Sequence, residues 1–477
     1  MNQTVSELLI DPPEFLRETF ELQQAAFAAA PMPSLQERRK HLLALRQLLV
    51  SNREALAEVV DHDYNGRSRN ETLIAEIAPC LLHIDYTLKH LGTWLKPQRR
   101  NPGLLFLPAR ARVIFQPLGV VGIISPFNYP VYLAVMPLIT AIAAGNRAML
   151  KLSEATPRTA NLLHELLGKT FKADLVSVIR GDAETGAAFA QLPFDHLLFT
   201  GSTAIGRKIM QAAANNLTPV TLELGGKSPA IIADDISMSL VAERLCFAKS
   251  LTAGQTCIAP DYVLLPRNRM NEFIEEFGTV FRKMYPAIEG NADYTGIIHQ
   301  HAYQRLQSWL QDAAEKGAQI IRIGESKNAD GKLRMPMHLV CNVNENMQIM
   351  QHELFGPVLP LLPYDSIDAA IHYVNSHPRP LALYLFSNEK SLQHRITFGT
   401  HAGSMCFNEA LLQIGVDDMP FGGIGPSGMG QYHGHEGFLT FSATKSILQK
   451  GRLNSARLLY PPYGTKIQKW LMRWLFR

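Results

Sequence analysis

Residues 119–151 read GVVGIISPFNYPVYLAVMPLITAIAAGNRAMLK, and no charged residue occurs between Val113 and Asn146. An uncharged stretch of this length is long enough to span a bilayer. However, it contains four prolines as well as glycine and polar residues. A lipid-exposed helix could not satisfy its backbone groups across so many breaks. We therefore interpret residues 119–125 as a buried strand, PFNYP as a turn and residues 131–145 as a buried helix.

The same alternation of short apolar runs and helix-like segments continues to Gly225. The predicted strands are GVVGIIS (119–125), RAMLK (147–151), DLVSVIR (174–180), DHLLFT (195–200) and PVTLELG (219–225). The predicted helices between them are 131–144, 157–171, 183–191 and 204–215. Continuous apolar strands alternating with helices indicate a parallel sheet covered on both faces. Such sheets bind ligands beyond the carboxyl ends of their strands.

A second region of alternation extends from Ser228 to about Phe407 and predicts a second α/β domain. Its predicted strands are PAIIA (229–233), YVLLP (262–266), HLVCNV (338–343), FGPVLPLL (355–362), LALYLFS (381–387) and GSMCF (403–407). Its predicted helices include 237–251, 271–284 and 302–316. Before the first sheet, residues 12–95 have the pattern of amphipathic helices, and residues 95–117 predict a two-stranded arm.

Composition limits the class of protein. The 477 residues are 47% hydrophobic and 18% charged, which is typical of a globular protein of two or three domains. A net charge of +4 and the absence of a basic block give no reason to expect nucleic acid. The five cysteines form no CxxC pair, which argues against a disulfide framework or a zinc cluster and for a reducing compartment. The polar N-terminus has no signal-peptide pattern, so we expect a cytoplasmic protein. From the spacing of the cysteines we expect no bound metal.

The C-terminal sequence YPPYGTKIQKWLMRWLFR differs from the rest of the chain. Lysine and arginine alternate with apolar residues at spacings of three and four, so a helix would have one basic and one apolar face. That composition fits a helix lying on an anionic membrane surface. The alternative is a C-terminal helix docked on the protein or across a partner subunit.

Four short motifs carry residues suited to chemistry. In GQTCIAP, small residues leave room around Cys257, whose thiolate would attack a carbonyl, although a lone cysteine is more often an inert core residue. In LELGGKSP, Glu223 ends an apolar strand, where desolvation suits a carboxylate to accept a proton; a structural ion pair is the alternative.

In ISPFNYP, Asn128 offers an amide donor for an oxyanion, although turn geometry alone also explains an asparagine there. In FTGSTAIG, a strand meets a helix N-terminus, where free N–H groups favour phosphate. This motif is not GxGxxG and is moderately specific by itself.

Together, the motifs resemble the aldehyde dehydrogenase superfamily from about Phe20 to Ser446. The motifs that carry the resemblance are ISPFNYP, KLSE, FTGSTAIGR, LELGGKSP, GQTCIAP, QHELFGPVLP, FNEALLQ and PFGGIGPSGMGQYHGHEGFLTFSATKS, in this order. PFNYP and GSTAIG make the chain similar to the fatty-aldehyde and coniferyl-aldehyde dehydrogenase branch. The resemblance implies a Rossmann-like cofactor domain, a second α/β catalytic domain and a small β oligomerisation arm.

The resemblance implies roles for individual residues. Cys257 corresponds to the nucleophile, Glu223 to the general base and Asn128 to the oxyanion donor. Glu353 and Phe355 correspond to the residues that hold the nicotinamide ribose and ring. Further expected cofactor contacts are Ser125, Pro126, Phe127, Lys151 (adenosine ribose), Ser153, Glu154, Gly201, Ser202 (pyrophosphate), Ile205 (adenine), Gly206, Leu224 and Gly225. A carboxylate at Glu154, three residues after Lys151, would repel a 2′-phosphate and favours NAD, with NADP as the alternative cofactor.

These correspondences define the expected organisation. Residues 1–98 and 114–225 form the NAD(P)-binding domain, 226–415 the catalytic domain, 99–113 and 438–450 the oligomerisation arm, and 455–477 the tail. The apolar segments 104–113 and 438–448 would pair with another subunit, and we expect a homodimer.

The expected reaction oxidises a medium- or long-chain aliphatic or an aromatic aldehyde, such as coniferyl aldehyde, to the acid through a cysteine thioester. Two alternatives are an acylating relative that uses CoA or phosphate and a non-catalytic membrane-associated homologue. Glu223 argues against the acylating alternative, because such relatives commonly lack the water-activating glutamate.

Overall fold

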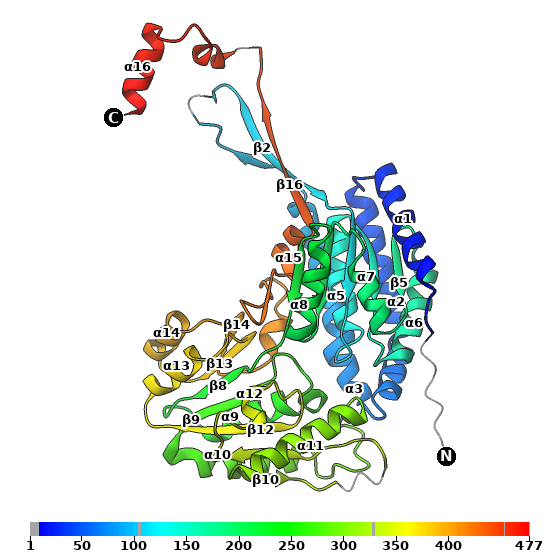
Figure 1. The fold of residues 1–477 in the computed structure, drawn as a ribbon, viewed down its shortest axis with the longest axis vertical. Helices are drawn as coiled ribbons and strands as arrows, with labels where there is room; N and C mark the ends of the chain where they lie inside the picture. Colours follow the sequence, from blue (N-terminus) through cyan, green and yellow to red (C-terminus); the bar gives the residue numbers. More distant parts are fainter. Residues whose placement is uncertain (1–8, 104–105, 327–329, 453, 477) are drawn as a thin grey trace.

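The computed structural model describes residues 9–103, 106–326, 330–452 and 454–476. It contains two α/β units joined side by side and a β arm that extends away from them, with the C-terminal helix near the tip of the arm (Figure 1). The predicted fold class is therefore confirmed. The outermost N-terminal residues, 1–8, and Arg477 belong to predicted regions but lie outside the described part of the chain.

The first unit is built on a six-stranded sheet in the order β15-β7-β6-β3-β4-β5. Its strands are β3 (Val120–Ile124), β4 (Arg147–Lys151), β5 (Val176–Ile179), β6 (His196–Thr200), β7 (Val220–Glu223) and β15 (Gly428–Met429). The helices between its parallel strands are α5 (Tyr132–Ala144), α6 (Pro157–Thr170), α7 (Ala183–Ala190) and α8 (Thr203–Ala214). Strands β3 to β7 are parallel, as predicted, and β15 adds an antiparallel edge.

Residues 119–145, within the uncharged stretch, form β3, a turn and α5. Every residue of α5 is buried, which explains why it carries no polar face. The helix ends at Gly145, whose left-handed backbone (φ 93°) terminates it because glycine adopts that conformation without steric cost. No helix in the described residues is long and apolar enough to cross a membrane.

The second unit is built on a seven-stranded sheet in the order β10-β11-β12-β9-β8-β13-β14. Its strands are β8 (Pro229–Ile232), β9 (Tyr262–Pro266), β10 (Gln319–Ile323), β11 (Met337–Cys341), β12 (Val358–Tyr364), β13 (Ala382–Phe386) and β14 (Ser404–Phe407). Its helices are α9 (Met238–Ser250), α10 (Met270–Met284), α11 (Gln300–Glu315), α12 (Gln348–Gln351), α13 (Ile367–Asn375) and α14 (Lys390–Gly399). The sequence analysis missed β10, an antiparallel edge strand that is largely uncovered and so lacks a continuous apolar run.

The N-terminal region is helical, as predicted. It comprises α1 (Pro13–Ala29), α2 (Leu35–Asp63), the short α3 (Arg69–Thr72), a π-helical turn (Leu73–Ile77) and α4 (Ala78–Trp94). Ser34 caps α2 in a reciprocal capping box with Glu37. These helices pack against the first unit, with α2 and α4 beside α5.

The arm contains three strands: two lie in residues 95–117, as expected, and the third lies in the segment 438–450, which was also assigned to the arm. They are β1 (Gln98–Arg100), β2 (Arg110–Pro117) and β16 (Ser442–Gln449), in the order β1-β2-β16. β16 pairs with β2 of the same chain along its whole length, so two segments far apart in the sequence meet in the arm. Of the segment 104–113, residues 104–105 lie outside the described part of the chain. The tail forms α16 (Lys466–Leu475), which has no buried residue and projects from the arm (Figure 1).

Candidate active site

A cavity of about 290 Å³ lies where the carboxyl ends of β3, β6 and β7 face loops of the second unit. This is the edge at which the parallel sheet predicted a ligand. The predicted residues that line it are Pro126, Phe127, Asn128, Gly201, Ser202, Glu223, Gly225, Cys257, Glu353 and Phe355. Residues from both units are thus brought together around one space.

Cys257 lies on the loop between a 3₁₀ turn (Leu251–Gly254) and β9. Gln255 shapes this loop, since its side-chain amide donates to the carbonyls of Thr252 (2.9 Å) and Gly296 (3.0 Å). Burial, with the nearby charges of Glu353 and Glu223, raises the pKa of the Cys257 thiol to about 12. The thiol is therefore neutral in the free protein and needs a base to become a nucleophile.

Glu223 ends β7, directly before the glycine pair of LELGGKSP. Its side chain is buried, and neither carboxyl oxygen has a hydrogen-bond partner among the described residues. Burial raises its pKa well above the usual range of a glutamate. This argues against a structural ion pair and describes a carboxyl group with high affinity for a proton, which suits a general base.

Asn128 occupies the turn between β3 and α5 and is 2% exposed. Its backbone carbonyl accepts hydrogen bonds from the Tyr64 hydroxyl (3.1 Å) and Arg67 Nη1 (2.8 Å). Its side chain lines the same cavity as Cys257. The backbone of the turn is thus held in place, and an amide side chain at the same cavity as a candidate nucleophile is what oxyanion stabilisation needs.

Glu353 lies in the loop before β12, and its carboxylate rests against Gly225. A Cβ atom on Gly225 would come within 2.1 Å of Glu353 Oε2, so the close approach requires glycine. Burial and the charge of Asp261 raise the pKa of Glu353 to about 8, against the opposing effects of the Gly226 N–H and Lys227. The second glycine, Gly226, has ordinary space around it, since its nearest neighbour would be 3.5 Å away.

The motif FTGSTAIG forms the end of β6 and the start of α8. Ser202 is the N-cap of α8, and its hydroxyl accepts the Ile205 N–H (3.4 Å). Ile205 is 44% exposed, which leaves an apolar surface beside the helix N-terminus. Gly206 instead faces Leu224, which would lie 2.6 Å from a Cβ, so these two residues pack the helix onto the sheet.

The remaining predicted cofactor residues lie at the ends of β3 and β4. Lys151 is buried and forms an ion pair with Glu154 (3.1 Å), a half-exposed carboxylate. Ser153 accepts the Ala155 N–H in the turn that follows. Ser125 is buried, and its N–H donates to the Lys151 carbonyl. None of these four is among the residues that line the 290 Å³ cavity.

The sequence analysis missed several residues that line this cavity: Thr200, Gln255, His299, His301, Ala302 and Arg305. His299 caps α11, and Arg305 donates to the Leu354 carbonyl (2.8 Å) while its guanidinium covers Trp309. Thr200 and Gln255 stand in the motifs FTGSTAIG and GQTCIAP, whereas residues 299–305 carry no motif quoted above. The sequence did predict a helix that starts near these residues. It did not show that their side chains would face the loop of Cys257.

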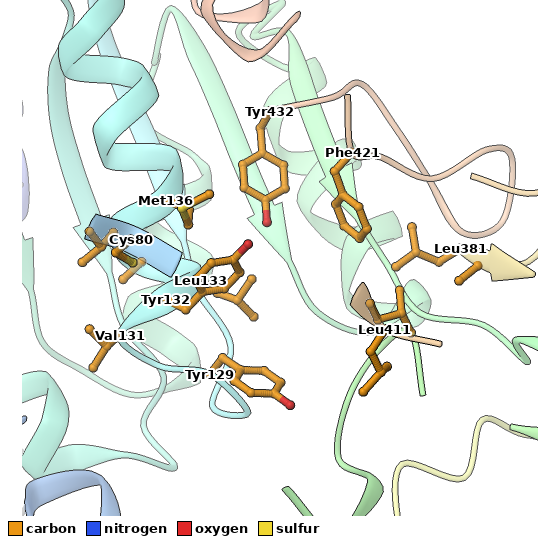
Figure 2. Close-up of a cluster of buried hydrophobic side chains, with 14 of the residues drawn as sticks. Cys80, Tyr129, Val131, Tyr132, Leu133, Met136, Leu381, Leu411, Phe421 and Tyr432 are labelled. Atoms are coloured by element: carbon orange, nitrogen blue, oxygen red, sulfur yellow. The ribbon is translucent and has the colours of Figure 1, made fainter. Parts of the chain in front are cut away.

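A second, almost wholly apolar cavity of about 180 Å³ also reaches Cys257. Its walls come from Ile74, Ala75, Pro79, Tyr129, Tyr132, Leu133, Phe247, Leu251, Thr256, Ile258, Leu411, Leu412, Ile414 and Gly415. Figure 2 shows Tyr129, Tyr132 and Leu133 on one side of this interior and Leu411 on the other. Cys257 therefore lies between two cavities. We call the first, of about 290 Å³, the polar cavity, and the second, of about 180 Å³, the apolar cavity.

The polar cavity fits NAD(P), because Ser202 at the N-terminus of α8 and the contact of Gly225 with Glu353 line it, and the exposed Ile205 follows Ser202 on the first turn of that helix. In the described residues, no cluster of histidine, cysteine or acidic side chains has the arrangement of a metal site. A doubly wound sheet, a half-buried cysteine and a buried carboxyl group at one cavity define a dinucleotide-dependent dehydrogenase that works through a thiol.

Comparison with known proteins identifies the family. The sequence model of the aldehyde dehydrogenase family matches residues 14–447, and the chain belongs to this family as an NAD(P)-dependent aldehyde dehydrogenase. It is 52% identical over 455 residues, or 95% of each chain, to a probable coniferyl aldehyde dehydrogenase of Pseudomonas aeruginosa. This agrees with the branch that the motifs indicated.

Two solved structures resemble more than nine-tenths of the chain. The substrate-bound state of Staphylococcus aureus AldH has a TM-score of 0.91 and 36% identity, covering 97% of this chain and 99% of that one. The Mycobacterium tuberculosis aldehyde dehydrogenase in complex with NAD+ has a TM-score of 0.85 and 28% identity, covering 93% and 92%. The family oxidises aldehydes to acids with NAD(P), so the expected reaction and cofactor are confirmed.

Proposed function

We propose that Cys257 is the nucleophile, Glu223 the base and Asn128 the oxyanion donor of this chain's aldehyde oxidation. The observation that carries the proposal is that Cys257 lines both the polar cavity and the apolar one. An aldehyde held in the apolar cavity would present its carbonyl carbon to the sulfur, with the cofactor in the polar cavity. Bound NAD(P)+ supplies the acceptor for the hydride that leaves the aldehyde carbon.

The groups of the chain then act in sequence. Glu223 takes the thiol proton, directly or through water, and the Cys257 sulfur bonds to the carbonyl carbon. The Asn128 amide and the Cys257 backbone N–H hold the oxygen as it gains charge. After hydride departs, the acyl group remains as a thioester. Once Glu223 has passed the thiol proton to solvent, it removes a proton from water, which attacks the thioester; the acid is released, and the departing sulfur regains a proton from Glu223.

We propose that Glu353 and Phe355 hold the nicotinamide ribose and ring, and that Lys151, Ser153 and Glu154 bind the adenosine ribose. The N-terminus of α8 with Ser202 would receive the pyrophosphate, and Ile205 the adenine. Ser125, Gly206 and Leu224 would support this surface from behind, since they are buried. The first unit is accordingly the NAD(P)-binding domain and the second the catalytic domain.

We propose that the substrate is an aromatic or a medium- to long-chain aliphatic aldehyde. The walls of the 180 Å³ cavity offer apolar contacts along its length. Burial of apolar surface therefore favours such aldehydes over short or charged ones. The similarity to a probable coniferyl aldehyde dehydrogenase supports the aromatic choice.

A panel of aldehydes scored by kcat/KM, with NADH absorbance as the readout, tests both the reaction and its residues. Cys257→Ala should abolish turnover, and Cys406→Ala is the matched control, since Cys406 is also half-buried but lies in β14. Turnover by Cys257→Ala would refute the thioester route. Free acid formed without CoA or phosphate would separate this reaction from an acylating one.

We also propose that α16 lies on an anionic membrane surface. Its apolar residues are exposed, with Trp470 at 65% and Trp474 at 53%, and Lys466, Lys469 and Arg473 supply positive charge. Co-sedimentation with vesicles of phosphatidylglycerol and phosphatidylcholine tests this, with a chain ending before residue 461 as the control. Unchanged sedimentation of the shortened chain would refute it.

A cytoplasmic homodimer is the assembly we propose. Strands β1 and β16 are the outer strands of the arm sheet, and their free edges could pair with a second copy. Light scattering of the full chain, compared with a variant carrying proline at an outward-facing position of β16, tests this proposal. Pairing through the arm predicts dissociation of the variant.

A further inference from the structure

An ion pair lies in the interior beside the turn that carries Asn128. The guanidinium of Arg67 and the carboxylate of Glu76 are 3.1 Å apart, and both side chains are fully buried. The sequence analysis assigned no role to either residue. Because two charges lose their hydration when buried, such a pair adds little stability compared with apolar residues of the same size. Its presence therefore calls for a reason other than stability.

The pair holds the turn from both ends. Arg67 Nη1 donates to the Asn128 carbonyl at 2.8 Å. Glu76 Oε2 accepts the N–H groups of Val131 (2.8 Å) and Tyr132 (3.1 Å), at the start of α5. Since Arg67 and Glu76 are themselves joined, the carbonyl of Asn128 and the first turn of α5 are fixed relative to each other.

Aromatic rings fix the orientation of the guanidinium. The Arg67 Cζ lies 5.0 Å from the ring centre of Tyr64 and 4.9 Å from that of Tyr129, both cation–π distances. The Tyr64 hydroxyl adds hydrogen bonds to the carbonyls of Phe127 (3.2 Å) and Asn128 (3.1 Å). Two consecutive carbonyls of the turn are thus held from the same side.

Tyr129 also joins this turn to the loop of the nucleophile. Its hydroxyl is 2.7 Å from the hydroxyl of Thr256, the residue before Cys257, and accepts a hydrogen bond from Thr252 (3.1 Å). A shift of Arg67 would therefore disturb both the turn and its link to the loop of Cys257.

We propose that Arg67 is a positioning residue that, with Glu76, holds the Asn128 amide in register with the Cys257 sulfur. This inference rests on the oxyanion role of Asn128 proposed above. Arginine suits the task because its Nη1 reaches the Asn128 carbonyl and the Glu76 carboxylate together while the guanidinium lies against the rings of Tyr64 and Tyr129. A lysine keeps the charge but has no planar guanidinium for the two rings to orient.

A double-mutant cycle on kcat tests the inference. Arg67→Lys should lower kcat by about ten- to a hundredfold, because small displacements of a catalytic group are costly. The KM for NAD+ should stay within about twofold, since the cofactor does not use this contact. In the background of Asn128→Ala, the same substitution should cost less than about threefold, because the group it positions is already gone.

A matched control substitutes a second buried arginine at the opposite end of α5. Arg38 Nη1 donates to the carbonyls of Ala143 (2.9 Å) and Ala144 (2.6 Å), so Arg38→Lys disturbs the same helix far from Asn128. Its effect should be the same with and without Asn128→Ala. Tyr64→Phe keeps the ring and removes the hydrogen bonds to the carbonyls of Phe127 and Asn128. The same cycle with this milder variant tests whether the turn positions the Asn128 amide even if Arg67→Lys does not fold.

The outcomes separate the two proposals. Suppose that Asn128→Ala lowers kcat and that Arg67→Lys lowers it by the same factor with or without Asn128→Ala. Arg67 then does not act through Asn128, and this inference fails while the oxyanion role stands. If Asn128→Ala keeps the full kcat, the oxyanion role fails and this inference fails with it. An Arg67 effect that disappears in the Asn128→Ala background supports both.

Discussion

Substitution of Gly225 by alanine should impair the cofactor site with little effect on folding. The added Cβ would lie 2.1 Å from Oε2 and 2.4 Å from Oε1 of Glu353. An ordinary contact begins at 3.4 Å, so the carboxylate must retreat by about 1.3 Å. The group that moves is the end of a flexible side chain, which is why the cost to stability should be small.

Displacement of about 1 Å in a positioning group can cost about a hundredfold in rate, equivalent to about 2.7 kcal/mol of transition-state stabilisation. We expect kcat/KM for NAD+ to fall by about this factor in Gly225→Ala. Initial rates at varied NAD+ and saturating aldehyde measure it, and a thermal unfolding scan checks the fold.

Gly226→Ala is the matched control. The nearest atom to its Cβ would be 3.5 Å away, so the same methyl group one residue later fits without displacement. It should keep near-normal kinetics. If both variants show the same loss, or if Gly225→Ala retains normal kcat/KM, then Glu353 does not hold the cofactor from the position seen here.

Three further predictions concern charge and protonation. Because the pKa of Cys257 is raised to about 12, the thiolate is scarce in the free protein, and the rate of alkylation of Cys257 by iodoacetamide should rise about tenfold per pH unit beyond about pH 9, where an ordinary thiol has levelled off; mass spectrometry of the labelled peptide follows it, and a plateau near that pH would contradict the burial argument. Glu223→Gln should slow both the first turnover of NADH and the steady turnover by about a hundredfold or more, since thiol activation and deacylation both lose their base; stopped-flow absorbance separates the two phases, a rapid first turnover would show that another base takes the thiol proton, and unchanged steady turnover would exclude Glu223 as the base of deacylation. Glu154→Gln removes the charge beside Lys151 and should raise kcat/KM for NADP relative to NAD by roughly tenfold, measured with both cofactors; an unchanged ratio would show that this carboxylate does not select the cofactor.

Much of the fold was predictable from local pattern. The five parallel strands of the first unit coincide with the predicted apolar runs, and α9 starts one residue after the predicted boundary because Ser237 is its N-cap. The strand β10 was not predicted because it is a partly exposed edge strand. Only a buried strand has a continuous apolar run that can be recognised in a sequence. The helix α11 begins at Gln300, two residues before the predicted start, where His299 supplies a cap that residue type alone did not reveal.

The candidate site divides in the same way. Cys257, Glu223 and Asn128 stand in motifs whose neighbours and order could be read along the chain. The ion pair of Arg67 and Glu76 could not be recognised, since polar residues in a helical region usually face solvent.

Sequence by itself therefore determined the alternating strands and helices, the family and the motifs that hold the proposed reacting groups, because each depends on residues that are close together or in a fixed order. Tertiary structure alone decided which strand pairs with β2, that His299 and Arg305 line the cavity of about 290 Å³, and that one buried guanidinium contacts Asn128. Those contacts join residues far apart in the chain, and their energies depend on burial and geometry that no local pattern specifies.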